Sequence, residues 1–149
     1  MVETLNTLDD QRPGKLPDPK TITLENVDGN HIVLDIGGGV YAFYAHLKKG
    51  SVRVSAGQHV KSGQALANLG NTGNTSAPHL HFHLMNGPSV LGSSGIPYTF
   101  RSFGLAGQIP VTASDLDGNF RTALFAKESL RQSQFPLDLT VIAFEAASH

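Results

Sequence analysis

The segment NHIVLDIGGGVYAFYAHL at residues 30–47 decides the fold. Two runs rich in β-branched and aromatic residues, 31–36 and 40–47, flank a run of three glycines, which predicts two strands joined by a turn. HLHFHLM at 79–85 alternates polar and apolar residues and predicts a third strand. Shorter β-type runs lie at 21–26, before the hairpin-type sequence Asp28-Gly29-Asn30, and at 51–54 and 64–69. Strands at this spacing, without helical periodicity between them, predict a mainly β fold with an antiparallel sheet or sandwich.

Outward from this segment, the sequence divides into three parts. Residues 1–20 contain three prolines and predict a surface loop, with the remnant of a strand at 2–5. Residues 21–103 contain the predicted β domain. Residues 104–149 form a loop-rich C-terminal extension, in which the apolar spacing of 123–133 predicts one short helix and 139–144 a final buried strand; one or two short strands are expected within 98–109.

Composition restricts the classes of function. The 149 residues suit about one domain, and a net charge of −1 gives no electrostatic basis for binding nucleic acid. The absence of cysteine excludes disulfide frameworks, thiolate nucleophiles and cysteine-based zinc sites. No apolar run is long enough to span a membrane, and the N-terminal residues lack the pattern of a signal peptide. The sequence does not determine the oligomeric state.

Histidines dominate the candidate chemistry. His79, His81 and His83 alternate along one predicted strand and therefore share a face, while Leu80, Phe82 and Leu84 are expected to face the core. By the same alternation, Tyr44 and His46 share a face of the strand at 40–47. If the two strands pair, His46 can approach His79 and His81. Histidines at i and i+2 on a strand commonly form part of a zinc site, and the Asn/Gly/Thr loop at 71–78 is of a kind that borders substrate clefts.

Four motifs occur in the order found in lysostaphin-type M23 zinc metallopeptidases. They are Tyr44-Ala45-His46-Leu47, the segment from Val54 to Gln64 that contains Gly57 and Gly63, Gly70-Asn71-Thr72-Gly73-Asn74, and Pro78-His79-Leu80-His81-Phe82. The chain resembles this family from about residue 29 to residue 85. The resemblance implies a β domain of the duplicated hybrid-motif type, Zn²⁺ as cofactor, hydrolysis of peptide bonds in bacterial peptidoglycan or its cross-bridges, and an extracellular or cell-envelope location.

The resemblance also implies roles for individual residues. His81 corresponds to a zinc ligand, and His46 and His79 correspond to the catalytic pair around a zinc-bound water and the developing oxyanion. Such a pair exchanges protons and stabilises the oxyanion, while zinc activates the water. Candidate substrate contacts are Tyr44, Asn71 and Asn74. His83, where the family commonly has Glu, is a possible auxiliary metal ligand.

The resemblance is incomplete at the metal site. The family's other two zinc ligands come from an upstream H-x-x-x-D motif, which is missing before residue 21. His31 and Asp35 have that spacing, but they lie where the family has an ordinary hairpin strand and are not expected to be ligands. His81 is then one of the three protein ligands that a catalytic zinc needs. We therefore expect a domain truncated at its N-terminus, and no activity from these residues alone.

Two alternatives remain open. The first is a catalytically inactive M23-like domain that binds cell wall or regulates another hydrolase. The second is a biotinyl or lipoyl carrier hairpin, suggested by the spacing of valines and glycines between Val54 and Leu66. A carrier needs its lysine at a tight hairpin tip between apolar neighbours. Lys61 is followed by Ser62 and lies in the wrong part of the unit, so the carrier reading is disfavoured.

Overall fold

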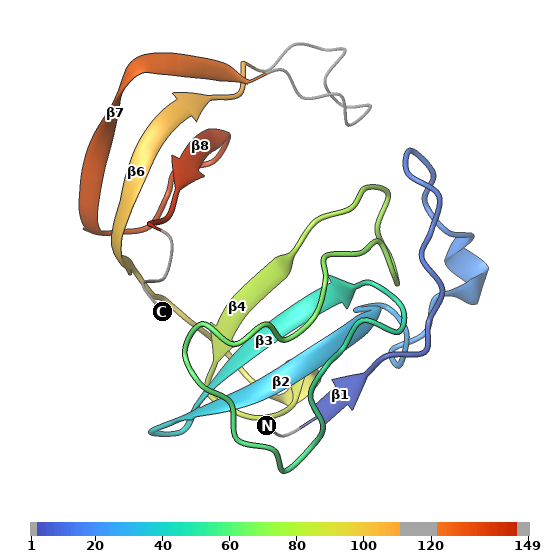
Figure 1. Ribbon diagram of the computed structural model, residues 1–149. Helices are drawn as coiled ribbons and strands as arrows, with labels where there is room; N and C mark the ends of the chain where they lie inside the picture. Colours follow the sequence, from blue (N-terminus) through green and yellow to red (C-terminus); the bar gives the residue numbers. More distant parts are fainter. Residues whose placement is uncertain (1–2, 111–121, 146–149) are drawn as a thin grey trace. The chain divides into compact units, whose positions relative to one another are not determined.

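The computed structural model describes residues 3–110 and 122–145 (Figure 1). The chain forms two compact units, one within residues 1–96 and the other within residues 97–149. Each unit is built on its own antiparallel sheet, and each is described separately here. The mainly β class and the antiparallel pairing predicted from the strand spacing are confirmed.

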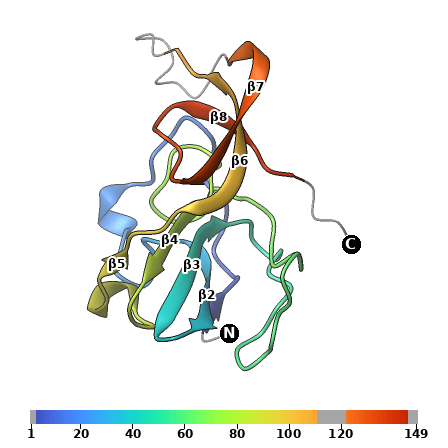
Figure 2. The same cartoon turned by 90° about the vertical axis from the view of Figure 1, so that its left-hand side faces the viewer.

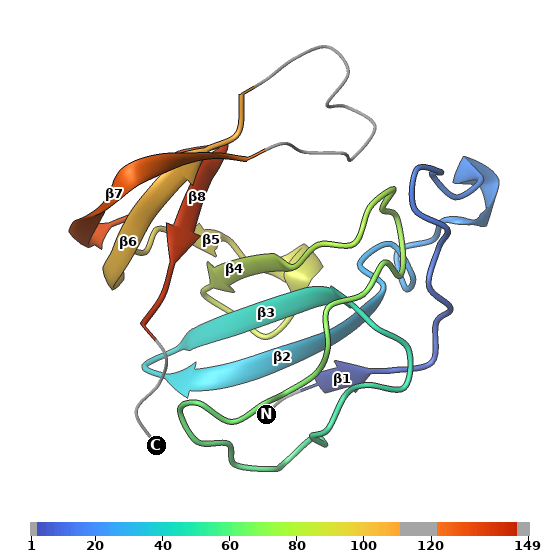
Figure 3. The same cartoon turned by 45° about the horizontal axis from the view of Figure 1, so that its top comes forward.

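The first unit is a five-stranded antiparallel sheet in the order β1-β2-β3-β4-β5 (Figure 3). The strands are β1 (Glu3–Leu5), β2 (Asn30–Gly37), β3 (Val40–Leu47), β4 (His81–Met85) and β5 (Gly95–Ile96). Strands β2 and β3 are joined by the predicted glycine turn. Strand β4 pairs along β3 through Phe43 opposite His83 and Ala45 opposite His81. The predicted strands at 31–36, 40–47 and 79–85 are thus confirmed, the last beginning at residue 81. The predicted strand at 2–5 is confirmed over Glu3–Leu5, and residue 2 lies outside the described residues.

The sheet is packed on both faces. One face buries a cluster of Val33, Phe43, Ala45 and Met85. The other buries Ile32 and Leu47 against Val54 of the irregular chain that connects β3 to β4. The histidine-bearing face is therefore not simply a solvent face, because His81 and His83 lie against the buried ring of Phe43, with ring centroids 6.0 and 5.1 Å away. Leu80, expected in the core, is 47% exposed, whereas Phe82 and Leu84 are partly buried.

Three predicted β segments of the first unit are irregular. The predicted strand at 21–26 and its hairpin are wrong: a 3-10 turn spans Pro19–Thr21 and turns follow it. Asn26 explains the difference, because its side chain accepts from Thr23 N and donates to Thr21 O, a local alternative to strand pairing. The segments 51–54 and 64–69 are not regular strands, although Arg53 N donates to Leu66 O over 2.8 Å.

The second unit is a three-stranded sheet in the order β7-β6-β8 (Figure 2). Its strands are β6 (Phe100–Gln108), β7 (Ala123–Gln134) and β8 (Thr140–Ala143). The short helix predicted at 123–133 is wrong, because this segment is β7 and pairs with β6 on both sides of an irregularity at 125–128. Leu124 and Leu130, the apolar positions that suggested a helix face, are 68% and 62% exposed, so no apolar helix face is buried. The predicted final strand is confirmed as β8, which is only partly buried.

No helix among residues 3–110 and 122–145 has the length and apolar character needed to cross a membrane.

Candidate active site

Three imidazoles meet at one end of the five-stranded sheet. His46 lies at the end of β3, His81 begins β4, and His79 precedes β4, where it bridges to Gly70. The ring of His46 lies 4.8 Å from that of His79 and 5.9 Å from that of His81, measured between centroids. Antiparallel pairing of β3 with β4 thus brings together the three residues that the sequence singled out.

His46 reaches the other two rings through a reversal of its backbone. Strand alternation places His46 on the face of Tyr44, and paired residues show that this is the opposite face from His81: Tyr44 pairs with Phe82, whereas Ala45 pairs with His81. The φ angle of His46 is 58°, in the left-handed region, which interrupts the alternation. The predicted shared face of Tyr44 and His46 is therefore wrong, although the predicted approach to His79 and His81 is confirmed.

The loop at 70–77 holds two of the rings. Nδ1 of His46 lies 2.7 Å from the carbonyl oxygen of Thr72, and Nδ1 of His79 lies 2.9 Å from that of Ala77. His46 N also donates to the carbonyl oxygen of Asp28 over 3.0 Å. His46 is only 6% exposed, whereas His79 and His81 are exposed. The site therefore has one buried and two accessible imidazoles.

Burial favours the neutral form of two of these rings. It lowers the pKa of His46, an effect opposed by the hydrogen bond to Thr72 and by Asp28 and reinforced by the neighbouring histidines. Burial also lowers the pKa of His81, and the adjacent His83 acts in the same direction. Neutral imidazoles keep a nitrogen lone pair, which is the form that takes a proton or binds a metal.

The described residues do not form a complete zinc site. Nε2 of His81 lies 3.0 Å from Nδ1 of His83, so these two nitrogens contact each other. Within residues 3–110 and 122–145, no group of three or more His, Cys, Asp or Glu side chains is arranged to hold a metal ion. A catalytic zinc normally takes three protein ligands and a water. The residues in hand therefore do not fit a catalytic zinc by themselves.

His31 and Asp35, which have the spacing of the missing motif, have local partners instead. Nδ1 of His31 lies 2.9 Å from the carbonyl oxygen of Gly29, and its ring packs on Phe43 at 5.6 Å. Asp35 accepts a hydrogen bond from Gly37 N at the end of β2. Neither belongs to a metal-binding group among the residues that the structure describes.

The candidate substrate contacts lie in three different environments. Asn74 is exposed on the loop beside the imidazoles. Asn71 is only 2% exposed, and its side chain donates to Gln11 O and accepts from Thr75. Tyr44 packs on Phe82, with ring centroids 4.9 Å apart, on the opposite face of the sheet. Of the three residues, only Asn74 is both exposed and on the loop that holds His46 and His79.

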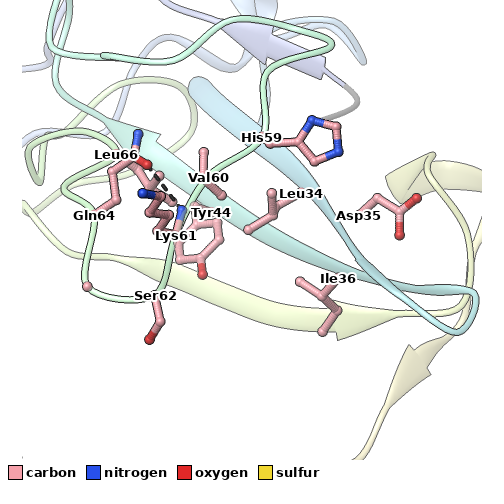
Figure 4. Close-up of a pocket in the computed structure, with 11 residues that line it drawn as sticks. Leu34, Asp35, Ile36, Tyr44, His59, Val60, Lys61, Ser62, Gln64 and Leu66 are labelled. Atoms are coloured by element: carbon pink, nitrogen blue, oxygen red, sulfur yellow. Dashed lines mark hydrogen bonds between the residues drawn. The ribbon is translucent and has the colours of Figure 1, made fainter.

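Tyr44 lines a cavity of about 600 Å³ between the sheet and the turns at 59–66 (Figure 4). The polar groups around it include Asp35, His59 and Lys61, and none of the three imidazoles of the candidate site belongs to its lining. Burial raises the pKa of the Tyr44 hydroxyl. This cavity is separate from the histidine cluster.

Sequence reasoning missed the polar residues beneath the site. Asn30, Thr72 and Thr75 are 0%, 0% and 4% exposed, and all three make hydrogen bonds through their side chains. Polar residues in a glycine-rich loop ordinarily indicate an exposed turn, so the sequence around Thr72 contains no signal of burial. The positions become visible only when their distant partners are known.

Comparison with known proteins places these features in a family. The family model described as "Peptidase family M23" matches residues 17–91, about half of the chain. The chain is 40% identical over 57 residues to peptidoglycan DD-endopeptidase ShyA of Vibrio cholerae, and 47% identical over 58 residues to lysostaphin of Staphylococcus simulans. Each alignment covers 38% of this chain, but only 13% of ShyA and 11% of lysostaphin.

Among solved structures, the chain is similar to the catalytic domain of a variant of the prophage-encoded M23 protein EnpA from Enterococcus faecalis. The sequences are 25% identical, the TM-score is 0.41, and the superposition covers 62% of this chain and 67% of that domain.

Proposed function

Because this chain belongs to peptidase family M23, we propose that it contributes His46, His79 and His81 to the centre of a peptidoglycan endopeptidase. The substrate would be a peptide bond in the cell-wall peptide or cross-bridge. The supporting observation is the meeting of the three imidazoles, with His46 turned onto the face of the other two. The similarity to ShyA, which is named a peptidoglycan DD-endopeptidase, and to lysostaphin supports an activity on peptidoglycan.

The three histidines would have different roles. His81, at the start of β4, would be the metal ligand that this chain supplies. His46 and His79 would exchange protons with the reacting groups and stabilise the developing oxyanion, which imidazole does well because its ordinary pKa lies near neutrality. Asn74 would contact the peptide from the loop, because it is the exposed asparagine there.

Zinc would need ligands that are not among the described residues. In this proposal His81 supplies one protein ligand, with His83 as an auxiliary, and the remaining ligands come from outside residues 3–110 and 122–145. When bound, the zinc would supply the activated water. We place the activity in the cell envelope or outside the cell, where peptidoglycan is found.

The incomplete ligand set also favours a second candidate function. An M23-like domain that has kept its groove but not its metal would bind peptidoglycan peptides, or regulate another hydrolase, without cleaving them. Zinc content and cleavage together separate the two candidates. Tight zinc at one ion per chain, with release of peptide fragments from purified peptidoglycan, supports the endopeptidase. Retained binding of muropeptides without zinc and without cleavage supports the binding domain.

The division of roles can be tested with two variants of the full-length gene product. His81→Ala should abolish zinc retention, measured by elemental analysis after dialysis. His46→Ala should keep the metal and lose turnover, measured as new amino termini released from peptidoglycan. His59→Ala, which changes an exposed histidine outside the site, is the matched control and should do neither. Loss of the metal in His46→Ala would contradict the proposed roles.

A further inference from the structure

The loop at 70–77 holds both His46 and His79 through the same ring atom. Nδ1 of His46 lies 2.7 Å from Thr72 O, and Nδ1 of His79 lies 2.9 Å from Ala77 O. A carbonyl oxygen can only accept a hydrogen bond, so each Nδ1 must carry the proton. In the neutral ring, Nε2 is then the unprotonated nitrogen, on the far side of the ring from the loop.

Thr75 reinforces this arrangement at His79. Its hydroxyl oxygen lies 3.2 Å from His79 Nδ1 and 3.0 Å from Ala77 O, so it contacts both partners of that hydrogen bond. If Nδ1 carries the proton, the hydroxyl accepts from the ring and donates to Asn71 Oδ1, 3.1 Å away. The Thr75 hydroxyl and the His79 Nδ1–H then each have their hydrogen-bond partners. With the proton on Nε2 instead, the Thr75 hydroxyl could donate to Nδ1 only by giving up Asn71 Oδ1, and the carbonyl oxygen of Ala77 would still face the Nδ1 lone pair.

Thr72 acts on His46 through the backbone. Its hydroxyl donates to Leu47 O over 2.9 Å and accepts from Asn30 N over 2.8 Å, so the residue is fastened to both β3 and β2. These two bonds place the carbonyl oxygen of Thr72 at the His46 ring. A buried hydroxyl with both of its bonds made is rigid, because every alternative leaves a polar group unsatisfied.

The N-terminal segment completes the support. Asn71 N donates to Asp10 Oδ1 over 2.8 Å, and Asn71 Nδ2 donates to Gln11 O over 3.0 Å. Asn30 exchanges hydrogen bonds with the backbone of Leu8 at 2.9 Å in both directions. Residues 8–11 are therefore attached to Asn30 and Asn71, the two residues that contact Thr72 and Thr75.

We propose that Thr72 and Thr75 are positioning residues that hold His46 and His79 as Nδ1–H tautomers, with Nε2 of both rings free for proton transfer. The importance of this arrangement for catalysis rests on the proposed endopeptidase function. The arrangement itself does not, because the tautomer of an imidazole can be measured without any reaction.

The first test needs no variant. Long-range ¹H–¹⁵N correlation spectra of the metal-free chain, labelled at histidine and recorded at a pH where the rings are neutral, report which nitrogen carries the proton. We expect a protonated Nδ1 and a bare Nε2 at both His46 and His79. A protonated Nε2 at either ring overturns the proposal for that ring. His59, an exposed ring away from the loop, is the internal reference.

The second test removes the hydroxyl. Thr75→Val has nearly the same shape but cannot accept from His79 Nδ1 or from Ala77 N, so the His79 ring should show a mixture of both neutral tautomers, while His46 keeps its pattern. Thr75→Ser retains the hydroxyl and should restore the spectrum of the original chain. Thr75→Ala serves the same purpose as the valine variant if that protein fails to fold. An unchanged His79 spectrum without the hydroxyl overturns the positioning role, even if the variant is less stable. Absence of peptidoglycan cleavage would bear only on the proposed function, and these spectra would be unaffected.

Discussion

The first unit has two glycine-rich segments, 55–64 and 70–77. They are similar in composition but differ in exposure and in where their hydrogen-bond partners lie. The first lies on the surface and closes on itself. The second is buried and makes most of its hydrogen bonds to distant parts of the chain. The difference shows that a loop can be as firmly held as a strand when its polar groups are matched by remote partners.

The segment 55–64 contains two copies of one turn. Gln58 N donates to Ser55 O and Gln64 N to Lys61 O, at 3.0 and 3.1 Å, and in each turn the glutamine side-chain oxygen accepts from the first residue's N–H. Each glycine before the glutamine has a φ near +80°, as a type II turn requires. Because each turn satisfies its own polar groups, a local change should have a local effect.

The segment 70–77 depends on contacts with β2, β3 and the N-terminal segment. Asn71, Thr72 and Thr75 are almost fully buried, and their partners lie up to 61 residues away in sequence. The candidate active site is attached to this segment and not to the exposed turns. Three predictions test the contrast and are given in order of decreasing effect.

The largest difference is expected between two glycines with the same backbone angle. Gly57 and Gly73 both have a φ of 81°. Nothing lies within 4 Å of a Cβ added at Gly57, whereas a Cβ at Gly73 would overlap Gly29 N and lie 2.6 Å from Val27 O. Gly57→Ala should cost about 1–2 kcal/mol, for the left-handed backbone alone. Gly73→Ala should cost about 4 kcal/mol or more, because backbone atoms cannot easily move aside.

Urea unfolding followed by amide signals of β2 and β3 measures both values in the first unit. Equal costs for the two substitutions would contradict the contrast between the loops, because the left-handed backbone would then account for both.

An intermediate effect is expected at Thr72. Thr72→Val keeps the shape but leaves the buried Asn30 N without its acceptor and Leu47 O without one of its donors. This should cost roughly 2–4 kcal/mol. Thr72→Ser keeps the hydroxyl and should cost about 1 kcal/mol, for the lost methyl group. The same urea experiment distinguishes them, and a serine variant as unstable as the valine variant would show that packing, not hydrogen bonding, holds the loop.

The smallest effect is a pH dependence. Burial lowers the pKa of His46 below its ordinary value of 6.5, so the folded state binds a proton less readily than the unfolded state. The resulting stability is complete above pH 6.5 and is lost as the pH falls through the lowered pKa. His46→Gln should therefore lose less stability than the original metal-free chain over this range. Part of the slope should remain, because burial also lowers the pKa of His81. Thermal unfolding midpoints at a series of pH values check this, and identical slopes would contradict it.

The central strands were predictable because their residue types strongly favour β structure. The runs at 31–36 and 40–47 are dense in β-branched and aromatic residues, and both bury side chains on two faces of the sheet. The alternating histidines of β4 were equally clear. In these segments, local preference and final packing point to the same structure.

Two segments were predicted wrongly because local patterns were ambiguous. Leu124, Phe125 and Leu130 fit a helix face, but residues 123–134 form β7 through pairing with β6, which sequence periodicity cannot reveal. Near the N-terminal end of the β domain, Asn26 bonds to residues 21 and 23 and replaces the predicted strand by turns. In the first case a distant strand decided the structure, and in the second a single side chain did.

The sequence predicted which residues form the candidate site but not how their side chains are arranged. Spacing identified His46, His79 and His81, and pairing of β3 with β4 was enough to bring two strands together. The orientation of His46 depends on its left-handed backbone and on Thr72 O, 26 residues away, so alternation assigned its ring to the wrong face. The expected ligand pair of the metal could not be found, because the described residues do not contain it.

The reversed backbone at His46 has a consequence for protein engineering. A side chain normally changes sheet face only by a shift of one residue, which moves every later side chain as well. Here β3 has one extra residue between the pairs Ile32–Tyr44 and Asn30–Leu47, and the left-handed His46 lies in this bulge at the end of the strand. The bulge moves the His46 ring to the other face and leaves the pairing of the preceding residues intact. Transplanting the three histidines into another sheet would therefore require the strand end and its supporting loop to be copied together.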